Sequence, residues 1–413
     1  MRKRWLILCV VLCVCALLAG AWLALLAMRK PWILPVPGVR LEPARTLAWR
    51  SRMAPDSAFA LLAEAVEHPA LPRDIRRELL EEACGGPWSA ALHTNVVALL
   101  RPAEPALAPA RRAALAPDPQ MPRQSWAEKA LSYTDSRHLL QALELSALRK
   151  AETGQFAESY AELRALLGCA AIFTRGGCLR DHAIAIGGWY MACAAVRRAA
   201  MADTNPGEHT CRMRDFLLDY EAASEPWSET MRWECKFALD SVGPVFAGGA
   251  RGFRDRREAF FFGLGRLLGS TPSSVRASYK ALYSHLIDAA DKPYSRAWYD
   301  TLKARLRCGP VALLSSQDPA GRMLAATQMS LFQRVHLRWV AHRTDLRATA
   351  VFLAIRLYQS REGRPPSSLD ALVPAYIDAV PGNPFNESIP LDYRLGTNGS
   401  WRVWKFPPQP LGE

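Results

Sequence analysis

The amino-acid sequence predicts a mainly α-helical protein with an N-terminal transmembrane helix, a multi-helix body built on helical hairpins, and a small C-terminal α+β module that contains a β-hairpin. Three observations lead to this fold class. An uncharged apolar run covers residues 5–28, and apolar residues then recur at three- and four-residue spacing through most of the chain up to position 361. Only from residue 389 onward do they alternate with the period of two that is typical of strands.

The first predicted element is a membrane-spanning helix over residues 5–28, preceded by a short cytoplasmic tail, residues 1–4. The run contains 24 residues without a charge, and a helix of that length crosses a hydrocarbon core of about 30 Å. The basic residues at positions 2–4 favour a cytoplasmic N-terminus. We therefore expect a single-pass protein of the inner (plasma) membrane, with its body on the periplasmic or extracytoplasmic side.

A cleavable signal peptide is the alternative reading of the same segment. Ala19-Gly20-Ala21 has the small side chains of a processing site, but the apolar run continues well beyond it. An uncleaved signal anchor is therefore the preferred interpretation.

The net charge and the distribution of basic residues indicate which classes of partner the protein binds. The formal net charge is +13, and the basic residues outside positions 2–4, 29 and 30 are spread along the chain instead of clustered. Such a spread is typical of a solvated surface near anionic lipid or wall polymer, not of a nucleic-acid groove. We expect contact with membrane lipid through residues 5–28, a protein partner in the cell envelope, and no nucleic acid.

Residues 29–54 are predicted to form an extended stem, because they hold four prolines and show no sustained period. The next unit, residues 55–125, is predicted to hold N-terminal helices and a Pro-rich loop. Amphipathic helices are indicated over 55–69 and 73–84. The segment 101–124 is then predicted to be a linker or exposed loop, since it contains the prolines at 102, 105, 109, 117, 119 and 122.

Residues 126–343 are predicted to form the helical body, and its clearest part is a helical hairpin. Thr134 or Asp135 is a candidate cap for the first helix, Gly154 ends that helix, and Phe156 opens the second. Further helices are expected, separated by Gly- and Pro-containing breaks, over 180–202, 206–222, 228–242, 252–268, 274–290, 295–306 and 319–342.

Seven cysteines follow the anchor, an odd number and too few for a disulfide scaffold. Cys169 and Cys178 flank a predicted turn, so they form either a disulfide at the tip of a hairpin or two buried thiols. Both alternatives stay open at the level of sequence.

Residues 344–413 are predicted to form the C-terminal module. A buried helix ends at Gly363, and Ser367 and Asp370 have capping-box spacing for a short helix closed by Pro374. Asn398-Gly399 then supplies the tight turn of a β-hairpin that lays one apolar face on the long helix.

This arrangement resembles the globular part of the major pseudopilin of type II secretion systems, over about 70 residues. The matching residues are Leu357, Tyr358, Gly363, Arg364, Pro366, Leu369, Leu372, Val373, Pro384, Phe385, Leu391 and Tyr393. That family has an acidic calcium loop, whereas this chain offers only Glu387 and Asp392 there. The resemblance therefore implies the fold of a pseudopilin-like module and implies neither filament assembly nor a calcium site.

A wider resemblance covers most of the chain. The N-terminal anchor, the hairpin around "AETGQFAESY", the turn "DPAGRMLAA" and the ending "LYQSREGRPPSSLDALVP" together resemble a group of uncharacterised, membrane-anchored bacterial envelope proteins. The resemblance implies this architecture and an envelope location, and it implies no particular activity.

No catalytic, cofactor-binding or metal-ligating residue is predicted. The chain lacks the common nucleophile, phosphate-binding and zinc motifs, and its eight histidines are scattered. Glu158-Ser159 matches the acid of a helical cell-wall lyase, but the spacing favours an exposed carboxylate.

The sequence therefore favours a non-catalytic interaction or scaffold protein of the envelope. The alternatives are a hydrolase or lyase acting on cell-wall polymer, and an accessory factor of a type II secretion-like system. A lumenal glycosyltransferase, with acceptor sites at Asn386 and Asn398, is disfavoured by the absence of Asp-x-Asp.

Overall fold

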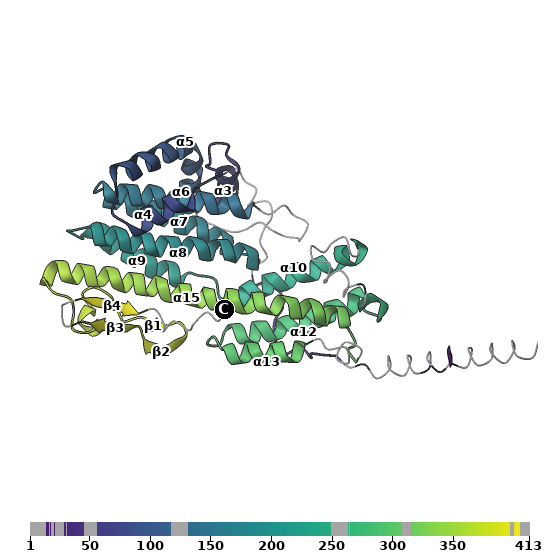
Figure 1. Ribbon diagram of the computed structural model, residues 1–413. Helices are drawn as coiled ribbons and strands as arrows, with labels where there is room; N and C mark the ends of the chain where they lie inside the picture. The colour runs from purple at the N-terminus through teal and green to yellow at the C-terminus, as the bar shows by residue number, and fades with distance from the viewer. Residues whose placement is uncertain are drawn as a thin grey trace, which may run out of the picture. The chain divides into compact units, whose positions relative to one another are not determined.

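The computed structural model describes residues 14, 15, 17, 20, 29, 31–44, 56–116, 131–248, 263, 265–307, 315–396 and 400–404. The described part is mainly helical with two small hairpins, which confirms the predicted helical class (Figure 1). The chain divides into two compact units. Unit 1 comprises residues 1–42, 235–289 and 295–333, and unit 2 comprises residues 43–234, 290–294 and 334–413.

Unit 2 is built around a stack of helices in which α7 packs against α5, α6, α8 and α9. Its complete helices are α3 (Ala58–Glu67), α4 (Arg77–Gly85), α5 (Ala90–Leu115), α6 (Tyr133–Glu152), α7 (Phe156–Thr174), α8 (Leu179–Ala202) and α9 (Glu208–Ala222). The helix α10 (Trp227–Gly248) begins in unit 2 and passes into unit 1 at Cys235.

The predicted helical hairpin is α6 and α7. Gly154 has φ +75°, the left-handed conformation that ends α6, and α7 begins at Phe156 as expected. The cap of α6 is Ser132 instead of Thr134 or Asp135, because its side chain accepts the backbone N–H of Asp135. The residues expected to face inward are buried except Phe156, which is partly buried; the buried ones are Leu140, Leu143, Ala147, Ala151, Tyr160, Leu163 and Leu167.

The prediction of a loop over 101–124 is wrong for its first part, because α5 continues through Pro102, Pro105 and Pro109 to Leu115. Pro102 and Pro105 lie on the exposed side, where water can reach the carbonyls that lose their N–H partner. The opposite side, from Ala103 to Ala113, is buried within unit 2. Tertiary packing therefore outweighs the unfavourable local propensity; residues 117–130 lie outside the described part.

Unit 1 contains α12 (Pro272–Ala290), α13 (Arg296–Leu306) and the first part of α15 (Pro319–Glu362). The described part of the predicted stem has no regular structure, and it binds α12. Trp32 Nε1 donates to Ser278 Oγ at 3.1 Å, and the Val36 amide donates to Ser284 Oγ at 2.8 Å. These contacts hold residues 32–36 along one helix, so this part of the stem is docked.

The long helix α15 replaces two predicted helices. The sequence placed a break at residue 343, between the helical body and the C-terminal module, but Pro319–Glu362 is one helix that passes from unit 1 to unit 2 at Arg334. The break fails because no proline or glycine lies between Gly321 and Gly363. Gly363, with φ +70°, ends the helix as predicted.

The C-terminal module packs on the second part of α15. A 3₁₀ turn, η2 (Leu369–Leu372), is followed by the antiparallel pairs β1 (Gly382–Asn383) with β2 (Asn386–Pro390) and β3 (Asp392–Leu395) with β4 (Trp401–Trp404). The β3–β4 pair confirms the predicted hairpin. The shared cluster contains Ala348, Val351, Ala354, Ile355, Leu357, Leu369, Leu372, Tyr376, Ile377 and Leu391.

Two details of the module differ from prediction. The N-cap position of η2 is Ser368 and its side chain makes no capping bond, so Ser367 and Asp370 form no capping box. Leu369, Leu372 and Val373 are predicted from the sequence to face inward on this short helix; Leu369 and Leu372 are buried, whereas Val373, which follows the end of η2, is 37% exposed. The Asn398-Gly399 turn lies outside the described residues.

The predicted membrane span, residues 5–28, lies outside the described residues except at positions 14, 15, 17 and 20. Among the helices that the structure describes, none is both long enough and apolar enough to cross a bilayer.

Candidate functional site

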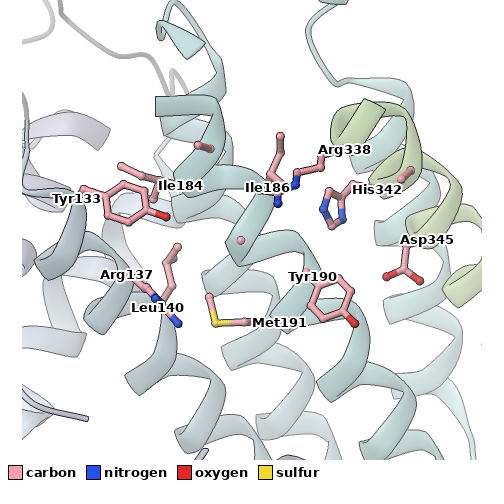
Figure 2. Close-up of a pocket in the computed structure, with 13 residues that line it drawn as sticks. Tyr133, Arg137, Leu140, Ile184, Ile186, Tyr190, Met191, Arg338, His342 and Asp345 are labelled. Atoms are coloured by element: carbon pink, nitrogen blue, oxygen red, sulfur yellow. The ribbon is translucent and has the colours of Figure 1, made fainter. Parts of the chain in front are cut away.

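A pocket of about 510 Å³ opens within unit 2, between α6, α8 and α15 (Figure 2). This volume lies in the range of about 300–1,000 Å³ that is usual for small-molecule sites. Its lining combines Tyr133, Arg137 and Leu140 of α6, Ala183, Ile184, Ile186, Gly187, Tyr190 and Met191 of α8, and Arg338, Ala341, His342 and Asp345 of α15.

Each helix contributes a stripe of side chains at helical spacing. On α6 the lining residues recur at four and three positions, from Tyr133 through Arg137 to Leu140, and on α15 they run from Arg338 through His342 to Asp345 in the same way. The site therefore follows from the helical periodicity of three segments, one of which is about 150 to 200 residues from the others along the chain.

A glycine pair on α8 shapes the pocket. A Cβ at Gly188 would lie 3.0 Å from Leu140 Cδ1 and 3.2 Å from the Cβ of Ala170, so this glycine lets α8 approach α6 and α7 closely. A Cβ at Gly187 would meet no atom within 4 Å. One glycine thus brings the walls together, and its neighbour leaves space inside the pocket.

The floor of the pocket is apolar. Leu140, Ile184 and Ile186 are buried, and Met191 is partly buried beside them. Figure 2 shows these side chains between Arg137 on one side and Arg338 on the other. A ligand that enters can therefore bury apolar surface on α8 while it stays within reach of charged groups at the edge.

Two arginines carry the positive charge of the rim. Arg137 and Arg338 are both exposed and line the pocket from α6 and α15. Neither guanidinium forms a hydrogen bond or an ion pair with any residue that the structure describes. Their charge therefore remains available to an incoming anion.

The carboxylate that lines the pocket, Asp345, is already engaged. Its side chain is 2% exposed, and Arg197 Nη1 donates to its Oδ1 at 2.7 Å. Arg197 Nη1 also donates to Thr349 Oγ1 at 2.6 Å, which fixes the guanidinium in place. This ion pair neutralises Asp345, so the two rim arginines dominate the electrostatic character of the pocket.

His342 lies at the aromatic side of the pocket. Its ring meets Tyr190 edge to face, with centroids 5.9 Å apart and an interplanar angle of 84°. Trp189 contacts the other side at 6.3 Å and 65°. Tyr190 itself is 58% exposed, so this wall offers an aromatic surface to a ligand.

A second group of ionisable side chains is buried between α5, α6 and α7. Glu162 accepts hydrogen bonds from Arg111 Nη2 at 2.7 Å, Lys150 Nζ at 2.5 Å and Ser146 Oγ at 3.2 Å. Burial opposes the ionised form, but these cations hold the pKa of Glu162 below its usual value. The group is fully paired and therefore ties three helices together.

Buried histidines elsewhere in unit 2 belong to an aromatic cluster. Trp227 stacks on His336 at 5.0 Å and 10°, and it meets His182 edge to face at 5.8 Å. Burial lowers the pKa of His182 to about 4 and that of His336 to about 3. Both rings are therefore neutral at pH 7 and pack as core residues.

Residues that the sequence singled out lie away from the pocket. Glu158 is exposed, as predicted, and Ser159 is buried with its hydroxyl on the Ala147 carbonyl at 2.8 Å. Cys169 and Cys178 are not joined, and their thiols contact the Ala110 carbonyl and the Asp181 carboxylate. Within the described part of the chain, no group of three His, Cys, Asp or Glu residues is arranged to hold a metal.

The lining residues of the pocket were not predicted as a site. In the sequence these residues occupy positions like any others on three amphipathic helices. The local signal for close packing is the Gly187-Gly188 pair inside a predicted helix. No family model, curated protein or solved structure matches the chain.

Proposed function

We propose that this chain is a non-catalytic binding protein of the bacterial envelope. In this proposal residues 5–28 anchor it in the inner membrane with the N-terminus in the cytoplasm, and unit 2 presents the pocket between α6, α8 and α15 on the extracytoplasmic side. The anchor is supported by the 24 uncharged residues of that run.

The observation that carries the binding role is a set of two arginines beside an apolar floor, neither of which has a hydrogen-bond or ion-pair partner in the described part of the chain. Exposed arginines are common, but Arg137 and Arg338 come from separate helices and line one cavity. The remaining charge of the lining, Asp345, is neutralised by Arg197 at 2.7 Å. A pocket with apolar walls and a few convergent polar groups is the usual form of a small-molecule site.

The C-terminal module is assigned a different role in this proposal. Its buried apolar residues, from Leu369 to Leu391, pack against α15 in a shared cluster. Arg347 of α15 also donates to the Gly382 carbonyl at 2.7 Å and to Glu387 at 2.6 Å. These contacts support a module that closes the fold, and the ligand binds elsewhere.

Filling the pocket tests the proposed function. The substitution Gly187→Phe places a large side chain where a Cβ meets no atom within 4 Å. Gly85→Phe is the matched control, because Gly85 also has open space around a Cβ, ends α4 and does not line the pocket. The full chain in nanodiscs is titrated with N-phenyl-1-naphthylamine, an uncharged fluorescent probe of apolar sites.

We expect saturable binding above the level of empty nanodiscs for the wild type and Gly85→Phe, and a loss of about tenfold or more in affinity for Gly187→Phe, because the probe loses its burial in the pocket. Equal binding by Gly187→Phe, or no binding by the wild type, would overturn the proposal.

A further inference from the structure

We infer that the natural ligand of the pocket is a single-chain amphipathic anion: an acyl chain or similar apolar body that carries one carboxylate or phosphate group. This inference rests on the proposed function and adds the chemical class of the ligand. It follows from the arrangement of charge and apolar surface around the cavity.

The apolar part of such a ligand matches the floor. Leu140 reaches the cavity from α6, and Ile184, Ile186 and Met191 reach it from α8. Gly187 lies between them and adds no side chain, so the surface of α8 is open at this point. Burial of a linear chain of methylene groups there is favourable, because it removes apolar surface from water.

The anionic part matches the rim. Arg137 and Arg338 stand on opposite sides of the floor in Figure 2. A polar head at either end of the cavity therefore meets a guanidinium that has no partner in the described chain. A cationic ligand is disfavoured, because Asp345 is held by Arg197 and is 2% exposed.

The aromatic wall adds uncharged ring surface to the pocket. Tyr190 presents an exposed ring, and His342 packs against it edge to face at 5.9 Å. The two tyrosines of the lining, Tyr133 and Tyr190, each carry an apolar ring and a hydroxyl. They can therefore contact an acyl chain with the ring and its polar head with the hydroxyl.

Matched ligands of one chain length test this assignment. The full chain in nanodiscs is titrated calorimetrically with octanoate, octan-1-ol and octylammonium, which share eight carbons and carry an anionic, a neutral and a cationic head group. We expect octanoate to bind about tenfold more tightly than octan-1-ol, the size of one charge-assisted hydrogen bond. Octylammonium should bind more weakly than both.

The arginines should account for this order. The double substitution Arg137→Gln with Arg338→Gln should remove the preference for octanoate over octan-1-ol. Arg180→Gln is the control, since Arg180 is an exposed arginine of α8 outside the lining. Raising the salt concentration should weaken octanoate alone, because screening acts on the charged head.

The outcomes separate the two proposals. Binding of the neutral naphthylamine probe without a preference for octanoate overturns the anion assignment and leaves the binding role standing. No probe binding overturns both. Nanodiscs of phosphatidylcholine and of phosphatidylglycerol distinguish the source of the anion. Neutral octan-1-ol is the ligand here, because an anionic bilayer surface repels octanoate whatever occupies the pocket. Equal octan-1-ol affinity in both supports a free single-chain ligand, and a tenfold loss in phosphatidylglycerol assigns the pocket to bilayer lipid instead.

Discussion

Two buried glutamates of the α6–α7 hairpin show how environment decides the state of one chemical group. Glu162 lies among Arg111, Lys150 and Ser146 and is ionised. Glu144 is 4% exposed, and the Cys84 thiol donates to its Oε1 at 3.5 Å. Desolvation raises the pKa of Glu144 to about 7, and the Cys84 bond offsets only a little of that effect.

The raised pKa of Glu144 predicts that Glu144→Gln increases the free energy of unfolding, and that the increase depends on pH. In the unfolded chain this carboxyl has a pKa near 4.3, so folding takes up a proton between about pH 4.3 and 7, and stability falls as pH rises through that window. We expect the variant to match the wild type at pH 4 and to exceed it by roughly 3 kcal/mol at pH 8. Denaturant unfolding at both pH values measures the difference.

Glu162→Gln is the control with the opposite sign. The folded pKa of Glu162 is lowered, so its contribution is present above the unfolded pKa and is lost as pH falls through the folded value. Removing this carboxylate leaves Arg111 and Lys150 partly uncompensated, which costs about 3–5 kcal/mol at pH 8. A Glu144→Gln variant that loses stability at pH 8 would contradict the raised pKa of Glu144.

At the scale of elements, α5 shows that tertiary packing can maintain a helix through internal prolines. Its three internal prolines predict a loop, yet the structure has one helix from Ala90 to Leu115. The close approach of α7 explains why this helix is tolerated: a Cβ at Gly168 would lie 2.6 Å from the Cβ of Ala114 and 2.8 Å from the Ala114 carbonyl oxygen. Packing against α7 thus offsets hydrogen bonds that the prolines cannot make.

This contact predicts that Gly168→Ala destabilises the chain by about 1–3 kcal/mol, because the added methyl group overpacks the α5–α7 interface. Gly187→Ala on α8 is the matched control, since a Cβ there meets no atom within 4 Å. That variant should gain about 0.5–1 kcal/mol from helix propensity. Thermal unfolding of both variants checks the pair, and an unchanged Gly168→Ala protein would mean that residues near Ala114 do not pack on α7.

Sequence patterns located most elements because each has a local cause. Gly154 and Gly363 end helices in both prediction and structure, and their positive φ values explain why glycine is there. The hairpin of β3 and β4 follows from alternation. The break at residue 343 failed for the converse reason: helical periodicity shows no boundary when two helices join without a glycine or proline.

At the scale of the whole molecule, the continuity of α15 changes how the C-terminal module is tested. Deleting residues 344–413 would cut α15 within its length and remove Asp345 from the lining of the pocket. The loss of binding in such a truncation would therefore say nothing about the module itself. Point substitutions in the pocket separate the two roles.

The proposed anchor predicts the behaviour of the full chain in cells. Because residues 5–28 are uncharged and long enough to span a bilayer of about 30 Å, we expect the full-length protein to stay with membranes after sodium carbonate extraction. Replacing Leu17 and Val14 by Arg should release it, since each central charge costs about 2.5–3.5 kcal/mol. Carbonate-soluble wild-type protein would contradict the anchor.

Local chemistry along the chain was enough to establish a mainly helical protein, its hairpin turns and the capping glycines, because those features depend on residues within a few positions of one another. The pocket, the helical path through the prolines of α5 and the ionisation of Glu144 arise only when α5, α6, α7, α8 and α15 pack together. Contacts between distant segments determine which side chains are buried and which charges are paired. The spacing and the type of single residues do not specify which helices are neighbours.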